Sequence, residues 1–145
     1  SAVLRAMLEA MHPGQLAPPV APMLIVATPV GQFHEFGALV ATLAAGSGGW
    51  RATYLGPDLP ADELAAAAHQ TGARAVALSL TYPPDDPRLA QELRRLRQRL
   101  PAGVAVLVGG LASRAYAEAL DAIGAVIVAD QLDFRAQLDR LRFVP

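Results

Sequence analysis

Short apolar runs alternate with amphipathic segments along most of the chain, starting near residue 23. The apolar runs occupy residues 23–27, 50–55, 75–80, 104–108 and 125–128. Continuous apolar runs of this length are typical of parallel strands that are covered on both faces. We therefore predict five strands, of which the second shows only weak alternation of apolar and polar residues.

Helical patterns lie between these runs and after the last one. Asp86 followed by Pro87 is predicted to cap one helix, Ser113 is predicted to cap the next, and Asp133 is predicted to open the last. Apolar residues that recur three and four positions apart indicate the faces that turn toward a core. These faces are Phe36, Leu39, Val40 and Leu43; Leu64, Ala67 and Ala68; Leu89, Leu93, Leu96 and Leu100; Tyr116, Leu120 and Ile123; and Phe134, Leu138 and Leu141.

The regular alternation of strands and helices predicts an α/β fold of the flavodoxin-like (Rossmann-like) type. We expect a five-stranded parallel sheet in the order 2-1-3-4-5 with helices on both faces. Such sheets bind ligands beyond the carboxyl ends of the strands, where the strand order reverses. Residues 22–145 are expected to form this domain. Residues 1–21 are expected to be a short helical stub and a linker, because residues 12–22 contain four prolines.

Composition narrows the possible chemistry. The chain has 145 residues, a net charge of −1 and no cysteine, so thiolate metal sites and disulfides are excluded and a cytoplasmic location is expected. All twelve basic residues are arginine, which excludes a Schiff-base lysine, a Walker-type lysine and a receiver-domain lysine. The charge gives no reason for this domain to contact nucleic acid. No apolar run is long enough to span a membrane.

Three loops should meet at the switch point, because they follow the first, third and fourth strands. The first loop contains Gln32, Phe33, His34, Glu35 and Gly37. The third strand ends with Ser79, Thr81 and Tyr82, and the fourth ends with Gly109 and Gly110. Taken alone, His34 could be an ordinary hydrogen-bonded loop residue, and the glycine pair could be a tight turn. A histidine facing small residues from two other loops leaves space for a large flat ligand.

The set Gln32-x-His34-x-x-Gly37, Ser79-x-Thr81 and Gly109-Gly110 resembles the cobalamin (vitamin B12)-binding domains of methionine synthase, cobalamin mutases and corrinoid methyltransferase proteins. The local sequences at Gly31–Leu39 and Tyr54–Pro60 are most similar to those of MerR-type cobalamin-dependent light-sensing transcription regulators. The resemblance covers about residues 22–143. In those regulators the domain follows a DNA-binding head and a helical bundle.

The resemblance implies roles for these residues. His34 would be the lower axial ligand of cobalt, replacing the cofactor's own benzimidazole base, and Gln32 stands where the family has an acid that fixes the histidine's other nitrogen. Gly37 would let the loop approach the corrin. Ser79 and Thr81 would line the channel for the displaced nucleotide tail, and Gly109 and Gly110 would give the tail room. Phe33, Glu35 and Tyr82 would contribute to cofactor binding from the same loops.

Three functions stay open at this point. The first is a sensory, non-enzymatic domain of a light- or cofactor-responsive regulator, with an upstream DNA-binding or helical domain and homo-oligomerisation. Since Ser1 passes directly into a helical pattern without an initiating Met, we expect the chain to be part of a longer protein. The second is a corrinoid carrier or subunit of a methyltransferase or mutase, for which an acid at position 32 would have been favourable. The third is a flavodoxin-like interaction module that no longer binds the cofactor.

Overall fold

A computed structural model describes residues 21–143, so the helical stub and most of the linker predicted at residues 1–21 lie outside the described residues. The elements are β1 (Met23–Pro29), α3 (Phe36–Ser47), β2 (Arg51–Leu59), α4 (Ala61–Thr71), β3 (Ala75–Ser79), α5 (Pro87–Arg99), β4 (Ala105–Gly109), the 3₁₀ turn η1 (Ser113–Tyr116), α6 (Ala117–Ala122), β5 (Val126–Ile127) and α7 (Gln131–Arg142).

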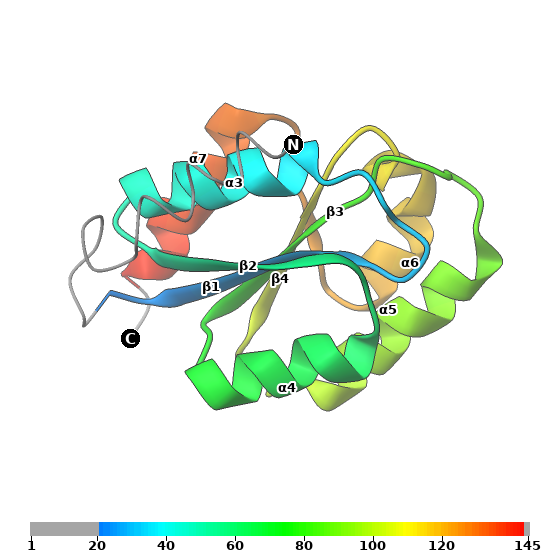
Figure 1. Ribbon diagram of the computed structural model, residues 1–145, viewed down its shortest axis with the longest axis horizontal. Helices are drawn as coiled ribbons and strands as arrows, with labels where there is room; N and C mark the ends of the chain where they lie inside the picture. The colour runs from blue at the N-terminus through cyan, green and yellow to red at the C-terminus, as the bar shows by residue number, and fades with distance from the viewer. Residues whose placement is uncertain (1–20, 144–145) are drawn as a thin grey trace.

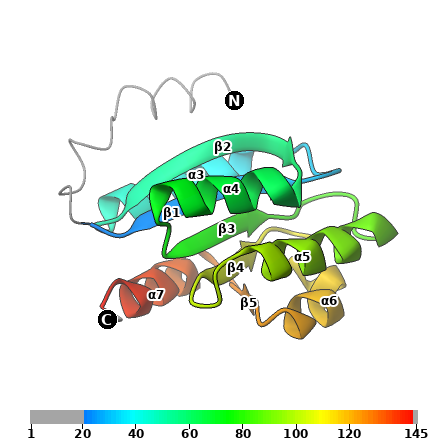
Figure 2. The same ribbon diagram turned by 90° about the horizontal axis from the view of Figure 1, so that it is seen from below.

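The strands form one parallel sheet in the order β2-β1-β3-β4-β5, as predicted. Helices α3 and α7 cover one face, and α4, α5 and α6 cover the other (Figures 1 and 2). This three-layer arrangement buries both faces of the sheet, which explains why its central strands are continuous apolar runs. The predicted α/β fold class is confirmed.

Alternate residues of the strands feed two separate apolar cores, as the period of two in a strand requires. Ile25, Val76 and Leu78 pack toward α4 and α5 with a set of leucines. On the other face the partners are smaller, because α3 turns Ala38, Ala44 and other small residues toward the sheet. The sheet face under α3 and α7 therefore has the greater capacity to leave an internal space.

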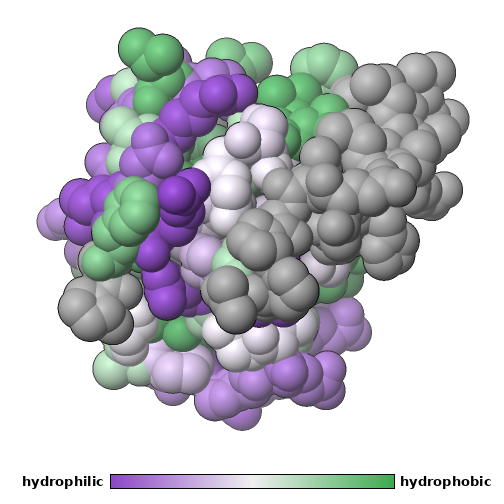
Figure 3. Space-filling view, turned by 90° about the vertical axis from the view of Figure 1, so that its left-hand side faces the viewer, coloured by the Kyte–Doolittle hydropathy of each residue, from purple (hydrophilic) through white to green (hydrophobic). Residues whose placement is uncertain are grey.

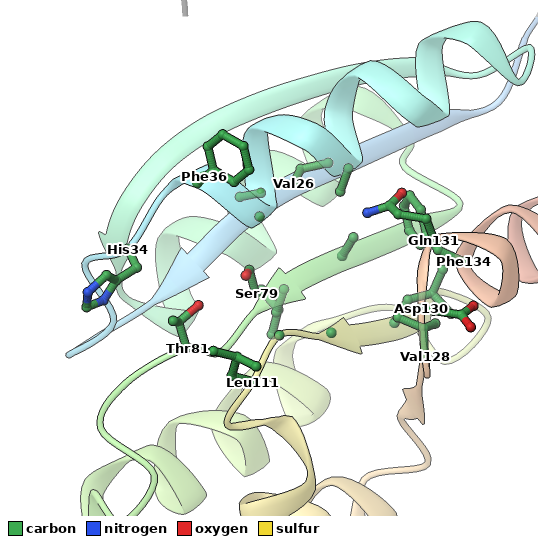
Figure 4. Close-up of a pocket in the computed structure, with 18 of the residues that line it drawn as sticks. Val26, His34, Phe36, Ser79, Thr81, Leu111, Val128, Asp130, Gln131 and Phe134 are labelled. Atoms are coloured by element: carbon green, nitrogen blue, oxygen red, sulfur yellow. The ribbon is translucent and has the colours of Figure 1, made fainter. Parts of the chain in front are cut away.

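The predicted inward face of α3 is only partly correct. Leu39 is fully buried, but Phe36 is 65% exposed, and Val40 and Leu43 are half-buried. The first turn of α3 lies over the carboxyl ends of the strands rather than over the sheet, so no strand covers Phe36 (Figure 4). The inward faces of the other helices contain the predicted leucines and aromatic residues, although Ala67 is only half-buried.

Helix capping confirms one prediction and corrects two. The Asp86 carboxylate accepts a hydrogen bond from the Arg88 backbone N–H (3.0 Å), and Pro87 is the first residue of α5. Ser113 is wrong as a cap, because it lies within η1 and its hydroxyl donates to the Gly110 carbonyl. Asp133 does not begin the last helix: α7 starts two residues earlier, and Asp130 caps it by accepting from the Asp133 backbone N–H (2.8 Å). Two aspartates three residues apart left this choice to the backbone geometry.

The amino-terminal and carboxyl-terminal ends of the strands lie on opposite sides of the molecule. Figure 3 shows the face at the amino-terminal ends of the strands, where hydrophilic residues extend from the upper left to the lower edge with a few apolar residues among them. The loops that follow β1, β3 and β4 lie on the opposite side, at the carboxyl-terminal ends of the strands (Figure 1). Within the described part of the chain, no helix is long and apolar enough to cross a membrane.

Candidate functional site

A cavity of about 440 Å³ lies between the sheet and the helices α3 and α7, at the carboxyl ends of the central strands (Figure 4). Six of the ten predicted site residues line it: His34, Gly37, Ser79, Thr81, Gly109 and Gly110. The three predicted loops therefore converge on one cavity, at the point where the strand order reverses.

Strand register sets two of these residues side by side. Ser79 of β3 pairs with Gly109 of β4, so both strands end at the same level. Helix α3 begins directly above them, and a Cβ atom on Gly37 would lie 2.9 Å from the Ser79 hydroxyl oxygen. A side chain at position 37 would therefore displace the Ser79 hydroxyl from its present position. With glycine at position 37, the Ser79 hydroxyl lies in the cavity wall under the first turn of α3.

The two glycines after β4 serve different purposes. Gly110 has φ +103°, and a Cβ atom there would lie only 2.3 Å from the Leu80 carbonyl oxygen. That oxygen already accepts a hydrogen bond from the Ala112 backbone N–H (2.9 Å), so it cannot move aside freely. The backbone itself requires glycine at position 110. At Gly109 the nearest atom would be a Val128 methyl group at 3.1 Å, inside the cavity wall.

His34 lies at the rim of this cavity, on the loop that leads into α3 (Figure 4). The side chain is exposed. Its ring is nearly perpendicular to that of Tyr82, with 6.4 Å between the centroids and an interplanar angle of 79°. This edge-on arrangement is a favourable aromatic geometry. An accessible imidazole beside a largely apolar cavity is suited to binding a metal that a ligand carries with it.

Gln32 has different contacts from those expected of a partner for the histidine. Its side chain is buried, and its amide oxygen accepts from the backbone N–H groups of Thr81 (2.8 Å) and Tyr82 (3.1 Å). Its amide nitrogen donates to the Pro83 carbonyl (3.1 Å). The structure therefore joins Gln32 to the loop after β3, and the expected hydrogen bond to His34 is replaced by these three.

The remaining predicted residues surround the site without lining the cavity. Phe33 and Tyr82 are each 64% exposed beside His34. Glu35 directly precedes α3, and its carboxylate accepts a hydrogen bond from the Tyr54 hydroxyl of β2 (2.6 Å). Two of these side chains therefore present apolar surface at the mouth of the site, while Glu35 ties the histidine loop to the edge strand.

Sequence reasoning missed two groups of residues that shape the site. Thr28 and Asp58 bind the histidine loop: the Thr28 hydroxyl donates to the Gln32 carbonyl and accepts from the Asp58 backbone N–H, and the Asp58 carboxylate accepts from the Gly31 backbone N–H (2.8 Å). Asp130, Gln131 and Phe134 line the cavity from α7. The fold itself offered the signal for the second group, because the loop after the fifth strand also lies at the carboxyl edge.

One carboxylate near the histidine loop is paired with an arginine. Asp86 lies near Gly31, whose Cβ position is 2.8 Å from the Asp86 carboxylate. The Arg88 guanidinium and backbone N–H donate hydrogen bonds to this carboxylate and lower the pKa of Asp86 below its ordinary value. The aspartate therefore stays ionised at neutral pH and is paired with Arg88.

The cavity is suited to part of a large ligand. Its volume lies within the usual range for small-molecule sites, roughly 300–1,000 Å³, and its walls are mainly apolar, with hydroxyls from Ser79 and Thr81. A flat heterocycle attached to a sugar fits such a space, whereas a complete corrinoid does not.

Comparisons with known proteins agree with this geometry. The family model described as "B12 binding domain" matches residues 22–133. The HTH-type transcriptional repressor CarA of Myxococcus xanthus is 34% identical over 125 residues, covering 86% of this chain and 43% of the repressor. The HTH-type transcriptional repressor CarH of the same organism is 39% identical over 83 residues, covering 57% of this chain and 28% of the repressor. The chain thus spans less than half the length of these relatives.

Solved structures show the same fold. A cobalamin-binding protein from Desulfitobacterium hafniense superimposes with a TM-score of 0.67 at 20% identity, over 97% of this chain and 66% of that one. The monomethylamine corrinoid protein of Methanosarcina barkeri gives a TM-score of 0.66 at 21% identity, over 94% and 68% of the two chains. With the sequence match extending over most of the chain, the conclusion is that this protein belongs to the B12-binding domain family.

Proposed function

We propose that this chain is the cobalamin-binding sensory domain of a transcription regulator that responds to light or to the state of its cofactor. Cobalamin is the cofactor that its family membership assigns to it. One observation carries the proposal: His34 lies at the rim of an apolar cavity that holds Ser79 and Thr81. This arrangement supports base-off binding, in which His34 would bind cobalt and the neighbouring cavity would receive the displaced base.

The residues of the site would divide the work of binding. The His34 imidazole would be the lower axial ligand of cobalt, since a neutral imidazole nitrogen is a good ligand for this metal. The cavity would receive the nucleotide tail, with the Ser79 and Thr81 hydroxyls available to its polar atoms. Phe33 and Phe36, both exposed, would lose apolar surface to the macrocycle. When bound, cobalamin supplies a chromophore and a light-sensitive bond between cobalt and carbon.

The regulatory part of the proposal rests on the relatives. Both matched proteins are named as transcriptional repressors and not as enzymes, which favours a sensor over a corrinoid carrier. In this proposal a DNA-binding or helical domain outside the present chain reads the operator, the protein acts in the cytoplasm, and the cofactor changes a homo-oligomeric interface. The domain itself catalyses no reaction.

Visible spectroscopy tests cofactor binding directly. The purified protein is mixed with hydroxocobalamin in the dark and desalted, and the spectrum is recorded. We expect a protein-bound spectrum that His34→Ala weakens or shifts. His69→Ala is the matched control, because His69 lies on α4 at the surface with its Nε2 atom 3.1 Å from the Arg99 carbonyl. A folded, colourless wild-type protein would refute cofactor binding, and an unchanged spectrum for His34→Ala would refute the ligand assignment.

Light separates the sensor from the carrier. The adenosylcobalamin complex of the full-length protein is kept dark or illuminated, and its oligomeric state is measured by size exclusion. A light-dependent change in elution supports the sensory function. An unchanged elution together with methyl transfer to a partner protein would instead support the corrinoid carrier.

A further inference from the structure

Gln32 is anchored through both its backbone and its side chain. Its backbone N–H donates to the Pro29 carbonyl (3.0 Å), and its carbonyl accepts from the Thr28 hydroxyl and from the Asp58 backbone N–H (3.2 Å). The residue is 1% exposed. The turn that leads from β1 to His34 therefore holds Gln32 in one position, so its amide is a fixed point from which a second loop can be held.

The amide of Gln32 holds the loop after β3. Its oxygen accepts hydrogen bonds from the backbone N–H groups of Thr81 and Tyr82, and its nitrogen donates one to the Pro83 carbonyl. These contacts join residues 49, 50 and 51 positions apart in the sequence. Since buried polar groups that lose their partners are costly, the three hydrogen bonds fix the loop backbone relative to the histidine loop.

The same loop is held from the other side by Tyr116. Its hydroxyl donates to the Pro83 carbonyl (2.7 Å), the same atom that Gln32 contacts, and accepts from the Asp86 backbone N–H (2.9 Å). Tyr116 is buried in the core beneath α5 and α6. The loop thus has one anchor toward His34 and another anchor away from it, which makes the two separable by mutation.

Tyr82 transmits the position of this loop to His34. Gln32 binds the Tyr82 backbone directly, and the Tyr82 ring stands edge-on to the imidazole at 6.4 Å. The Tyr82 side chain is 64% exposed, so burial in the core does not account for its place. What it contacts is the histidine, and a ring on one side of the imidazole limits the directions in which the histidine can turn.

We propose that Gln32 and Tyr82 are positioning residues for His34, with Gln32 acting through the loop that carries Tyr82. This inference rests on the proposed function of His34 as a cobalt ligand. In this chain the residue two positions before the histidine orients it through a neighbouring aromatic ring, and it does so without a direct hydrogen bond or a negative charge. Edge-to-face contacts of this kind change equilibria roughly 2- to 10-fold.

The test measures how well His34 competes with a free ligand. Each protein is loaded in the dark with methylcobalamin, whose upper cobalt position is occupied by carbon, and free imidazole labelled with nitrogen-15 is added until the NMR signal of its cobalt-bound form is half-saturated. The midpoint concentration reports the advantage of a positioned imidazole over a free one. We expect Tyr82→Leu and Gln32→Met to lower this midpoint roughly 2- to 10-fold. Tyr82→Phe keeps the ring, so it should keep the wild-type midpoint.

Two measurements keep orientation apart from folding. Tyr116→Phe removes a hydrogen bond to the same Pro83 carbonyl from the far side, so it should lower the unfolding temperature while leaving the imidazole midpoint at the wild-type value. In the cofactor-free protein, Gln32→Met should accelerate amide hydrogen exchange at Thr81 and Tyr82, because their N–H groups donate hydrogen bonds to Gln32.

The outcomes are distinct. A wild-type protein that binds no methylcobalamin would refute the proposed function. A coloured wild-type protein whose midpoint is unchanged in Tyr82→Leu would overturn the positioning role while leaving that function intact. Equal shifts in Gln32→Met and Tyr116→Phe would also overturn it, because they would trace the effect to general loosening of the loop.

Discussion

Alanine at position 110 should destabilise the fold even without cofactor. The resemblance to cobalamin domains implied that both glycines after β4 make room for a ligand, yet Gly110 has φ +103° and its Cβ position lies 2.3 Å from the Leu80 carbonyl oxygen. The strained backbone costs about 1–3 kcal/mol. The overlap with backbone atoms costs about 1–3 kcal/mol more.

These costs are large compared with the stability of a domain, which is roughly 5–15 kcal/mol. A loss near 3 kcal/mol should lower the Tm of a domain of this size by about 6–12 °C. Gly109→Ala is the matched comparison. Its added methyl group would meet only a Val128 methyl at 3.1 Å, so we expect a change of about 1 kcal/mol or less without cofactor, but cobalamin binding weakened roughly 5- to 150-fold.

Circular dichroism melting of both cofactor-free variants, followed by titration with hydroxocobalamin, measures the two effects separately. A Gly110→Ala protein that melts within about 2 °C of wild type would refute the backbone argument. A Gly109→Ala protein that binds as tightly as wild type would show that the ligand does not use that wall of the cavity.

Three further outcomes follow from the structure. Leu89→Ala should cost about 2–5 kcal/mol in urea unfolding, because the Leu89 side chain on α5 is fully buried in the core; a loss below about 1 kcal/mol would contradict this packing. The hydrogen bond from Arg95 lowers the pKa of Asp62, so its stabilisation is present above the ordinary aspartate pKa and is lost as pH falls through the lowered one; melting should separate Asp62→Asn from wild type at pH 7 and not at pH 2. A cobamide with an adenine lower base should bind more weakly than cobalamin in a competition titration, since the cavity walls are mainly apolar and its additional polar atoms would lose their contacts with water; equal affinity would contradict burial of the base among these apolar walls.

The side of the sheet on which the cavity lies has a simple packing cause. Leucines from α4 and α5 fill the space over one face, while α3 presents alanines and Gly46 to the other. Ala77 of β3 adds a small side chain to that second face. The small residues along α3 therefore leave the space for the cavity. Larger residues there would fill the site without disturbing the opposite core.

Most of the fold could be predicted from local pattern. Continuous apolar runs and helical periodicity depend on residues within a few positions of each other, and they correctly gave the strands, the strand order and the Asp86 cap of α5. The same patterns could not choose between Asp130 and Asp133 as the cap of α7, because both spacings are compatible with a first turn.

The sequence by itself determined the α/β class, the parallel order and the loops on which His34, Ser79 and Gly109 stand. Only the tertiary structure decided how those loops contact one another. The Gln32 amide oxygen accepts hydrogen bonds from Thr81 and Tyr82, which lie 49 and 50 positions away. The close approach of the Leu80 backbone requires glycine at position 110. The physical reason is that such contacts depend on strand register and on the close approach of distant backbones, and neither is encoded in the periodicity of neighbouring residues.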